Sequence, residues 1–145
     1  MTTQPMDAAR RLYVDTSAYL CILLGESGAA ALSEETADAH LLSSVLLVLE
    51  TRRNLVRLAR EGTLTADQYK TCADQLDADI ELFALRDVTL DLCRSSGMPA
   101  IATPRSLDLV HLRTALWFHA EHPIDRFVTM DDAQKESARE LGLPT

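Results

Sequence analysis

Short apolar runs alternate with longer segments of helical periodicity along most of this chain. The short runs predict β-strands at residues 12–14, 40–42, 80–85 and 126–129. The longer segments predict helices at residues 18–24, 29–39, 45–60, 64–78, 87–96, 105–120 and 131–142. This alternation is typical of α/β proteins, and we predict an α/β/α sandwich with a mainly parallel central sheet. Ligand sites in such sheets form in the crevice at the carboxyl ends of the strands.

The helix predicted at 105–120 has the most unusual pattern. At about 100° per residue its side chains are apolar on nearly every side, which is typical of a buried helix. Asp108 nevertheless lies on it, between Leu112 and Ala115 on the helical wheel. A buried carboxylate is costly unless it is paired, protonated or bound to a metal. Asp108 therefore either has a structural partner, such as a cap or an arginine, or lines a polar cleft beside the core.

Two more acids, Asp15 and Asp131, occupy the strand-to-helix turns after the first and last predicted strands. The carboxyl ends of parallel strands meet at one edge of a sheet, so we expect both acids at that edge. Asp is also a good N-cap, and each acid fits the start of the helix that follows it. Thr16 or Ser17 is a further candidate cap for the first helix. Two acids at equivalent positions of one sheet favour a shared site.

Glu50 lies in the helix predicted at 45–60, for which Ser43 and Ser44 supply an N-cap. One broad face of this helix is apolar, and the opposite stripe holds Glu50, Asn54, Arg53, Arg57 and Arg60. The stripe fits a solvated face with a Glu50–Arg53 pair. It equally fits a Glu50 that points into an acidic cleft, with arginines leading away from it along the path of a phosphate backbone.

The four acids would form a cation site if the fold brings them together. Four neighbouring carboxylates cannot all stay ionised without a positive charge between them. Ligands made only of oxygen suit hard ions such as Mg²⁺ or Mn²⁺, which activate water and neutralise charge on a phosphodiester. The pattern of residues identifies the candidate acids but does not show that they converge.

Composition limits the possible classes of protein. The 145 residues fit one domain, which we place at residues 12–143 after a flexible arm at residues 1–11. The formal net charge of −8 argues against nucleic-acid binding through bulk charge alone. The three cysteines are widely spaced and form no zinc pattern. We find no secretory signal, and no apolar run approaches the length of a membrane span, about 18 residues. We therefore expect a cytoplasmic protein without membrane partners.

Four segments occur in the order and context of one known family. They are LYVDTSAYL at residues 12–20, SSVLLVLE at 43–50, RSLDLVHLRTAL at 105–116 and FVTMDD at 127–132. The chain thereby resembles the PIN-domain family, and within it the VapC-type ribonuclease toxins of toxin–antitoxin pairs. The resemblance implies a Mg²⁺- or Mn²⁺-dependent endoribonuclease that forms a homodimer. It also implies inhibition by a cognate antitoxin protein that enters the active-site groove.

The resemblance also assigns roles to individual residues. Asp15, Glu50, Asp108 and Asp131 match the family's catalytic acids, and Asp15, Asp108 and Asp131 match its metal-holding positions. Asp131 is preferred to Asp132 because it follows Thr129 in a Thr-x-Asp pattern. Supporting hydroxyl groups match Ser17 and Thr129. Arg53 and Arg57 either contact RNA phosphates or form salt bridges or solvated side chains on the helix surface.

Other functions fit the residues less well. Haloacid-dehalogenase-like enzymes need an Asp two residues after the first, where this chain has Ser17. A receiver domain needs an acidic pair and a late lysine, and neither pattern occurs. A catalytically silent PIN-like module that binds RNA or protein stays as the alternative function. We interpret His111 as a core or helix-surface residue, and Trp117 and Phe118 as core or dimer-interface residues.

Overall fold

The computed structural model describes residues 9–94 and 105–145. Most of the predicted arm, residues 1–8, lies outside the described residues, as does the end of the helix predicted at 87–96. The elements, in chain order, are β1 (Arg11–Val14), α1 (Thr16–Leu24), α2 (Ala29–Thr36), β2 (His40–Ser44), α3 (Leu46–Arg60), α4 (Ala66–Ile80), β3 (Phe83–Arg86), α5 (Leu90–Arg94), α6 (Ser106–Glu121), β4 (Arg126–Val128) and α7 (Asp132–Glu140).

The sheet has four parallel strands in the order β3-β2-β1-β4. β1 is central, and Tyr13 pairs with Leu42 of β2 on one side and with Phe127 of β4 on the other. A parallel strand in this position is covered on both faces, which explains why β1 is apolar without alternating polar residues. The prediction of a parallel α/β sheet is confirmed.

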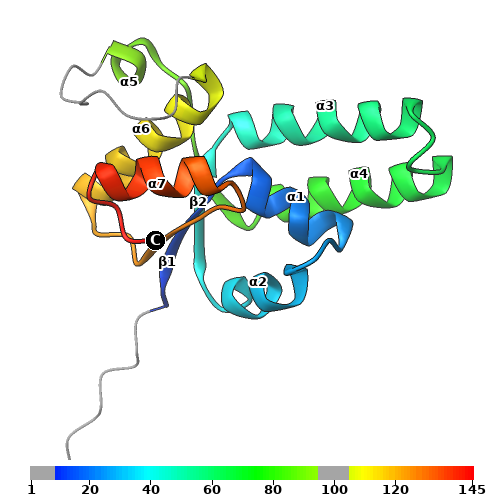
Figure 1. Ribbon diagram of the computed structural model, residues 1–145, viewed down its shortest axis with the longest axis horizontal. Helices are drawn as coiled ribbons and strands as arrows, with labels where there is room; N and C mark the ends of the chain where they lie inside the picture. The colour runs from blue at the N-terminus through cyan, green and yellow to red at the C-terminus, as the bar shows by residue number, and fades with distance from the viewer. Residues whose placement is uncertain (1–8, 95–104) are drawn as a thin grey trace, which may run out of the picture.

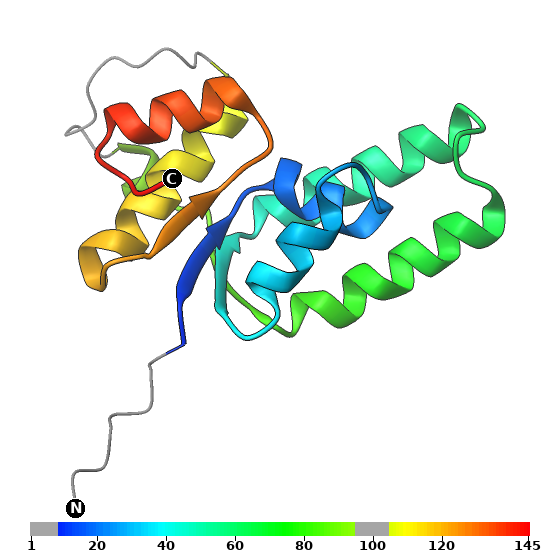
Figure 2. The same cartoon turned by 60° about the horizontal axis from the view of Figure 1, so that its bottom comes forward.

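Successive residues of β1 enter two separate cores. Leu12 and Val14 pack with α1, α2, α3 and α4 on one face of the sheet, while Tyr13 packs with α6 and α7 on the other. The two views in Figure 1 and Figure 2 show these helices as layers on either side of the strands. The fold is therefore the predicted α/β/α sandwich, in which side-chain alternation along each strand supplies both cores.

The order of the strands creates a topological switch point beside β1, and we call the region at the carboxyl ends of β1 and β4 the crevice. After β1 the chain forms α1 on one face of the sheet, whereas after β4 it forms α7 on the opposite face. Two neighbouring strands whose following helices diverge in this way leave an opening at their carboxyl ends. Asp15 and Asp131 are the residues that begin the two diverging helices.

Helix α6 is less buried than its sequence predicts. Leu112, Ala115 and Phe118 face the sheet and belong to the core. On the outer side, Leu107 is 45% exposed and Trp117 is 40% exposed. A helix in an outer layer has only one side in contact with the sheet, so a pattern that is apolar all round overstates its burial. The guanidinium of Arg86 covers part of Trp117, 4.5 Å from the ring centroid.

Several predicted boundaries shift in the structure. Asp15, rather than Thr16 or Ser17, caps α1. α4 continues to Ile80, so the strand predicted at 80–85 begins only at Phe83. Ser43 and Ser44 belong to β2, although the Ser44 hydroxyl still accepts a hydrogen bond from Leu46 N in the first turn of α3. The helix predicted at 29–39 ends at Thr36.

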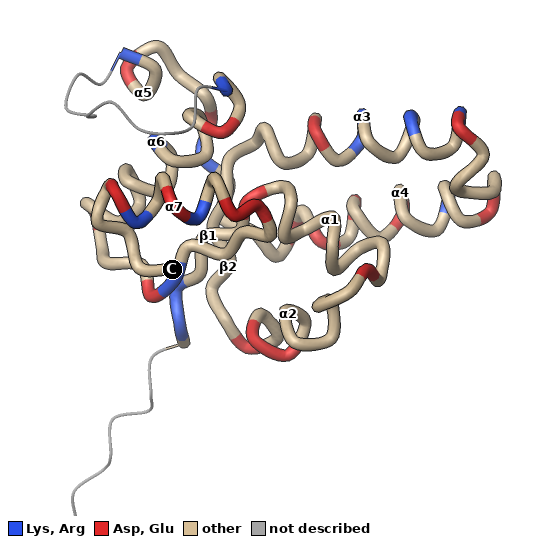
Figure 3. The backbone as a smooth tube through the Cα atoms, in the orientation of Figure 1, with Lys and Arg blue, Asp and Glu red and all other residues tan. Residues whose placement is uncertain are grey.

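Helices α3 and α4 form a pair that extends away from the sheet. Four arginines lie along α3, whereas α4 carries four aspartates and one lysine (Figure 3). The ion pair between Arg52 and Asp77 joins the two helices on the surface. Within the described ranges, neither these helices nor any other is long and apolar enough to cross a bilayer.

The packing of α6 on the sheet can be tested by truncation. Leu112 is fully buried, and we expect Leu112→Ala to lower the free energy of unfolding by about 2–5 kcal/mol because it leaves a cavity. Leu49, which is 67% exposed, is the matched control, and Leu49→Ala should change stability by less than about 0.5 kcal/mol. Urea unfolding followed by circular dichroism measures both. Equal losses for the two variants would contradict this packing.

Candidate functional site

Asp15 lies at the centre of the crevice and is only 4% exposed. Its backbone N–H donates to the carbonyl oxygen of Val128 (3.1 Å), which continues the β1–β4 pairing into the turn. Its side-chain oxygen Oδ1 accepts a hydrogen bond from the backbone N–H of Ala18 (3.0 Å) and caps α1. Asp15 is therefore the cap of α1, and capping uses only part of the acceptor capacity of its carboxylate.

Two hydroxyl groups hold the Asp15 carboxylate, one from α1 and one from the residue that follows β4. Ser17 donates to Oδ1 (2.7 Å) and Thr129 donates to Oδ2 (2.5 Å). The same hydroxyl oxygens accept backbone hydrogen bonds from Met130 (3.0 Å) and Asp131 (3.1 Å). The predicted supporting residues Ser17 and Thr129 thus link the end of β1 to the turn that leads from β4 into α7.

Burial raises the pKa of Asp15 above its ordinary value. Nearby His111 and the hydrogen bonds from Thr129 and Ser17 act in the opposite direction without cancelling the effect of burial. The hydrogen bonds therefore hold the carboxylate in one orientation, but they do not fully offset the cost of burying its negative charge. Such a group favours a nearby cation.

Glu50, in the first half of α3, reaches the same edge from the helical layer that also contains α1. Its Oε1 accepts hydrogen bonds from the Thr16 hydroxyl (2.7 Å) and from His111 Nε2 (2.9 Å). Partial burial alone would raise the pKa of Glu50, but these hydrogen bonds and the charge of Arg53 outweigh burial and lower it. Among the described residues, no hydrogen bond reaches Oε2.

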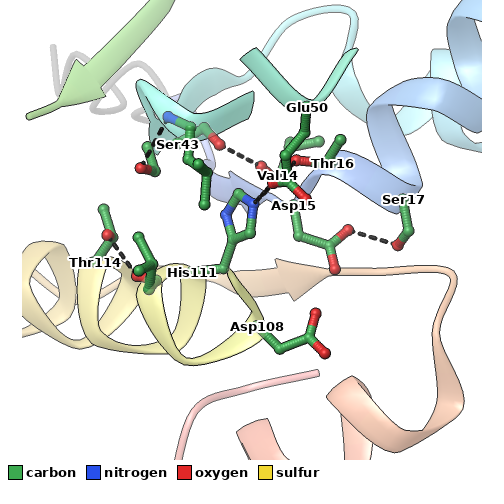
Figure 4. Close-up of polar contacts among 12 residues, drawn as sticks. Val14, Asp15, Thr16, Ser17, Ser43, Glu50, Asp108, His111 and Thr114 are labelled. Carbon is green, nitrogen blue, oxygen red and sulfur yellow. Dashed lines mark hydrogen bonds and ion pairs between the residues drawn. The ribbon is translucent and has the colours of Figure 1, made fainter. Parts of the chain in front are cut away.

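His111 has a larger role than its sequence context indicates. Its side chain is buried, at 2% exposure, and its Nδ1 lies 2.7 Å from the hydroxyl of Tyr13. Figure 4 shows its ring between α6 and Glu50. Of the two expected environments, core or helix surface, His111 occupies the core, and its partners there are the polar side chains of Tyr13, Thr16 and Glu50. The available signal was its spacing of three residues from Asp108, which places both on one side of α6.

Asp108 and Asp131 meet where the first turns of α6 and α7 approach each other. Partial burial raises the pKa of Asp108, and the negative charge of Asp131 raises it further. Gln134 connects the two acids: its side-chain Nε2 donates to the Asp108 carbonyl oxygen (3.0 Å), and its backbone N–H donates to Asp131 Oδ1 (3.1 Å). Asp131 is half-buried and caps α7, whereas the neighbouring Asp132 is exposed. No pattern in the sequence indicated Gln134.

The four predicted acids therefore share one edge of the sheet. Figure 4 shows Asp15, Glu50 and Asp108 arranged around this end of β1, and the negative charge of Asp131 is near enough to Asp108 to raise its pKa. They do not form a closed cluster: no three His, Cys, Asp or Glu residues within the described ranges stand close enough to hold a metal ion as they are placed. The structure brings the acids to one crevice and leaves them spread around it.

The two predicted phosphate-contacting arginines have different surroundings. Arg57 is paired with Glu61 (3.2 Å) and hydrogen-bonded to Asn54 (3.2 Å), which fits the salt-bridge interpretation. Arg53 is exposed and lies close enough to Glu50 to lower its pKa. The expected Glu50–Arg53 ion pair is not among the ion pairs of the part of the chain that the structure describes.

The donor set at this edge is chemically suited to a hard divalent cation. All four acids offer carboxylate oxygens, and the oxygens Glu50 Oε2 and Asp131 Oδ2 accept no hydrogen bond from the described residues. Burial raises the pKa of Asp15 and of Asp108, which disfavours their ionised forms. A divalent cation with oxygen ligands would favour the ionised forms instead.

The comparisons with protein families and with curated proteins found no relative of this chain. No protein-family model matches the chain, and no curated protein resembles it significantly. The function must therefore be argued from the residues and their geometry.

The charge imbalance at Asp108 predicts a specific effect of pH on stability. A folded-state pKa above the unfolded value means that the ionised carboxylate opposes folding at neutral pH. We expect Asp108→Asn to stabilise the metal-free protein at pH 7 by a few tenths to about 1 kcal/mol, the scale of a partly exposed charge pair. The difference should shrink as the pH falls through the pKa of Asp108 and the wild-type carboxyl group becomes neutral.

Urea unfolding in EDTA at several pH values between 4 and about 7.5 covers this titration range. Asp38→Asn is the matched control, because it removes the same charge from an exposed turn. A loss of stability in Asp108→Asn at pH 7 would show that the ionised carboxylate makes a net favourable contact in the folded protein.

Proposed function

We propose that this protein is a metal-dependent endoribonuclease that hydrolyses RNA phosphodiester bonds. The observation that carries the proposal is the linkage of Asp15 to the turn before Asp131 through Ser17 and Thr129. It places two acids at the carboxyl ends of adjacent parallel strands, where α/β proteins form their sites. Glu50 and Asp108 reach the same crevice from helices in opposite layers. The resemblance to PIN-domain proteins supports the same activity.

Asp15, Asp108 and Asp131 are the residues that would hold Mg²⁺ or Mn²⁺. Binding an ion would require these carboxylates to come closer together, because within the described ranges no three acidic, His or Cys side chains stand close enough to hold one. When bound, such an ion activates water and offsets the charge that builds up on a phosphodiester. The hydroxyl groups of Ser17 and Thr129 keep the Asp15 carboxylate in one orientation for this role.

Glu50 suits a different role from the other three acids. Its lowered pKa keeps it ionised near neutral pH, and its Oε2 is available to accept a hydrogen bond. A carboxylate of this kind can orient a water molecule for in-line attack on phosphorus. Arg53, on the next turn of α3, would contact a phosphate of the RNA strand.

The wider biological role follows from the same resemblance. We propose that the protein is the toxin of a type II toxin–antitoxin pair, acts on cellular RNA in the cytoplasm, forms a homodimer and is inhibited by a cognate antitoxin protein. The alternative is a catalytically silent PIN-like module that binds RNA or protein. One observation favours that alternative: the described acids do not form a closed metal-binding group.

RNA cleavage by the purified chain separates the two functions. We expect discrete fragments from total cellular RNA with Mg²⁺ or Mn²⁺ and none with EDTA. Asp15→Asn should lower the rate by at least about 100-fold, because losing about 3 kcal/mol of charge stabilisation corresponds to that factor. Asp38→Asn, in an exposed turn, should cleave like the wild type. RNA binding without cleavage, by a chain that mass analysis shows to be free of antitoxin, would support the silent module.

The contribution of Arg53 can be measured as binding in an Asp15→Asn background, where RNA stays intact. We expect Arg53→Gln to weaken the affinity for single-stranded RNA about 3–10-fold at low salt and to reduce the salt-dependence slope by about 0.7. Arg57→Gln is the control and should have a smaller effect, because Arg57 is already paired with Glu61. Fluorescence anisotropy across a salt series gives both quantities. Equal effects of the two substitutions would argue against a specific phosphate contact at Arg53.

A further inference from the structure

A chain of buried hydrogen bonds connects the core of the sheet to Glu50. The hydroxyl of Tyr13 lies 2.7 Å from His111 Nδ1, and His111 Nε2 lies 2.9 Å from Glu50 Oε1. The Thr16 hydroxyl is within hydrogen-bond distance of both His111 Nε2 (3.0 Å) and Glu50 Oε1 (2.7 Å). Tyr13, Thr16 and His111 are all at most 5% exposed. The end of this chain is thus a carboxylate held by two buried donors.

The contacts determine where the protons are. Glu50 is ionised and can only accept, so Thr16 must use its single hydroxyl hydrogen on Oε1. The Thr16 oxygen can then only accept from His111. His111 Nε2 faces two acceptors, Glu50 Oε1 and Thr16 Oγ1, and must therefore carry a proton. Nδ1 faces the Tyr13 hydroxyl, which can donate to it.

The chain also crosses from one helical layer to the other. His111 belongs to α6, whose core residues pack on the Tyr13 side of the sheet, while Glu50 belongs to α3, which packs on the Leu12 and Val14 side. The contact between them passes over the carboxyl edge of the sheet (Figure 4). It is therefore a direct link between the element that carries Asp108 and the element that carries Glu50.

We propose that His111 is the positioning residue of Glu50. By donating from Nε2 it occupies Oε1 together with Thr16, so that Glu50 keeps one side-chain conformation and presents only Oε2 to the crevice. Tyr13 fixes the orientation of the His111 ring through Nδ1. The inference rests on the proposed function only for what Oε2 then does, which is to orient water at the site.

The hydrogen-bond arrangement itself can be tested without any measurement of activity. Nitrogen-15 NMR of the imidazole side chains should show a proton on His111 Nε2 that exchanges slowly with solvent. The Glu50→Gln variant should shift this proton resonance, because an amide oxygen is a weaker acceptor than a carboxylate. A His111 ring without a proton on Nε2, or a resonance that Glu50→Gln leaves unchanged, would overturn the inference.

Two substitutions of His111 test the consequence for catalysis. Gln can place an amide N–H near the position of Nε2, whereas Leu cannot. We expect His111→Leu to lower kcat by about 10–100-fold, the usual cost of losing a partner of a metal-site carboxylate, with little change in KM. His111→Gln should recover most of this loss. The matched control is His122→Leu, at an exposed position just after α6, which should leave kcat unchanged.

The two experiments separate the inference from the proposed function. If the wild type cleaves RNA and His111→Leu cleaves it with the same kcat, the inference is overturned and the proposed function stays in place. If the Nε2 proton of His111 is present and its resonance shifts in Glu50→Gln, but the wild type never cleaves RNA, the positioning of Glu50 is supported and the nuclease proposal is overturned. If His111→Leu fails to fold, the comparison of wild type with Glu50→Gln by NMR still decides.

Discussion

The structure of the site depends on the hydrogen bonds that Asp15 receives at the end of β1. Its carboxylate joins the Ser17 hydroxyl in α1 to the Thr129 hydroxyl after β4, while its backbone N–H extends the pairing of these strands. Because α1 and α7 diverge to opposite faces at this point, these contacts, together with those of the Ser17 hydroxyl with Met130 N and the Thr129 hydroxyl, connect the two turns directly. The distance between Asp15 and the residues that begin α7 follows from them.

The carboxylates at this edge are stabilised in contrasting ways. Glu50 receives two hydrogen bonds on one oxygen, and its pKa falls despite partial burial. Asp15 receives three hydrogen bonds on two oxygens, yet its deeper burial still raises its pKa. For Asp15 the effect of burial exceeds the opposing effects of His111 and the hydrogen bonds, whereas for the less buried Glu50 it does not. This difference suits the acids to the distinct roles that we propose for them.

Long-range hydrogen bonds position the remaining acids. Gln134 joins the first turn of α6 to the first turn of α7, and His111 joins α6 to α3 across the sheet edge. Neither residue stands out in the sequence, because a buried Gln or His is ordinary unless its partners are known. Their partners lie 26 and 61 residues away along the chain. Local patterns carry no information about contacts of this kind.

Hydrophobic periodicity and strand-end positions are local properties, so residue patterns along the chain suffice to predict the layered α/β fold and to identify the four candidate acids. Periodicity overstated the burial of α6, since it reports which side chains are apolar but not how many sides of a helix meet a neighbour. The hydrogen bonds from Thr129 to Asp15 and from His111 to Glu50, and the spread of the acids around the crevice, emerge only in the folded chain. Each of these depends on strand order and side-chain packing, which bring distant residues together.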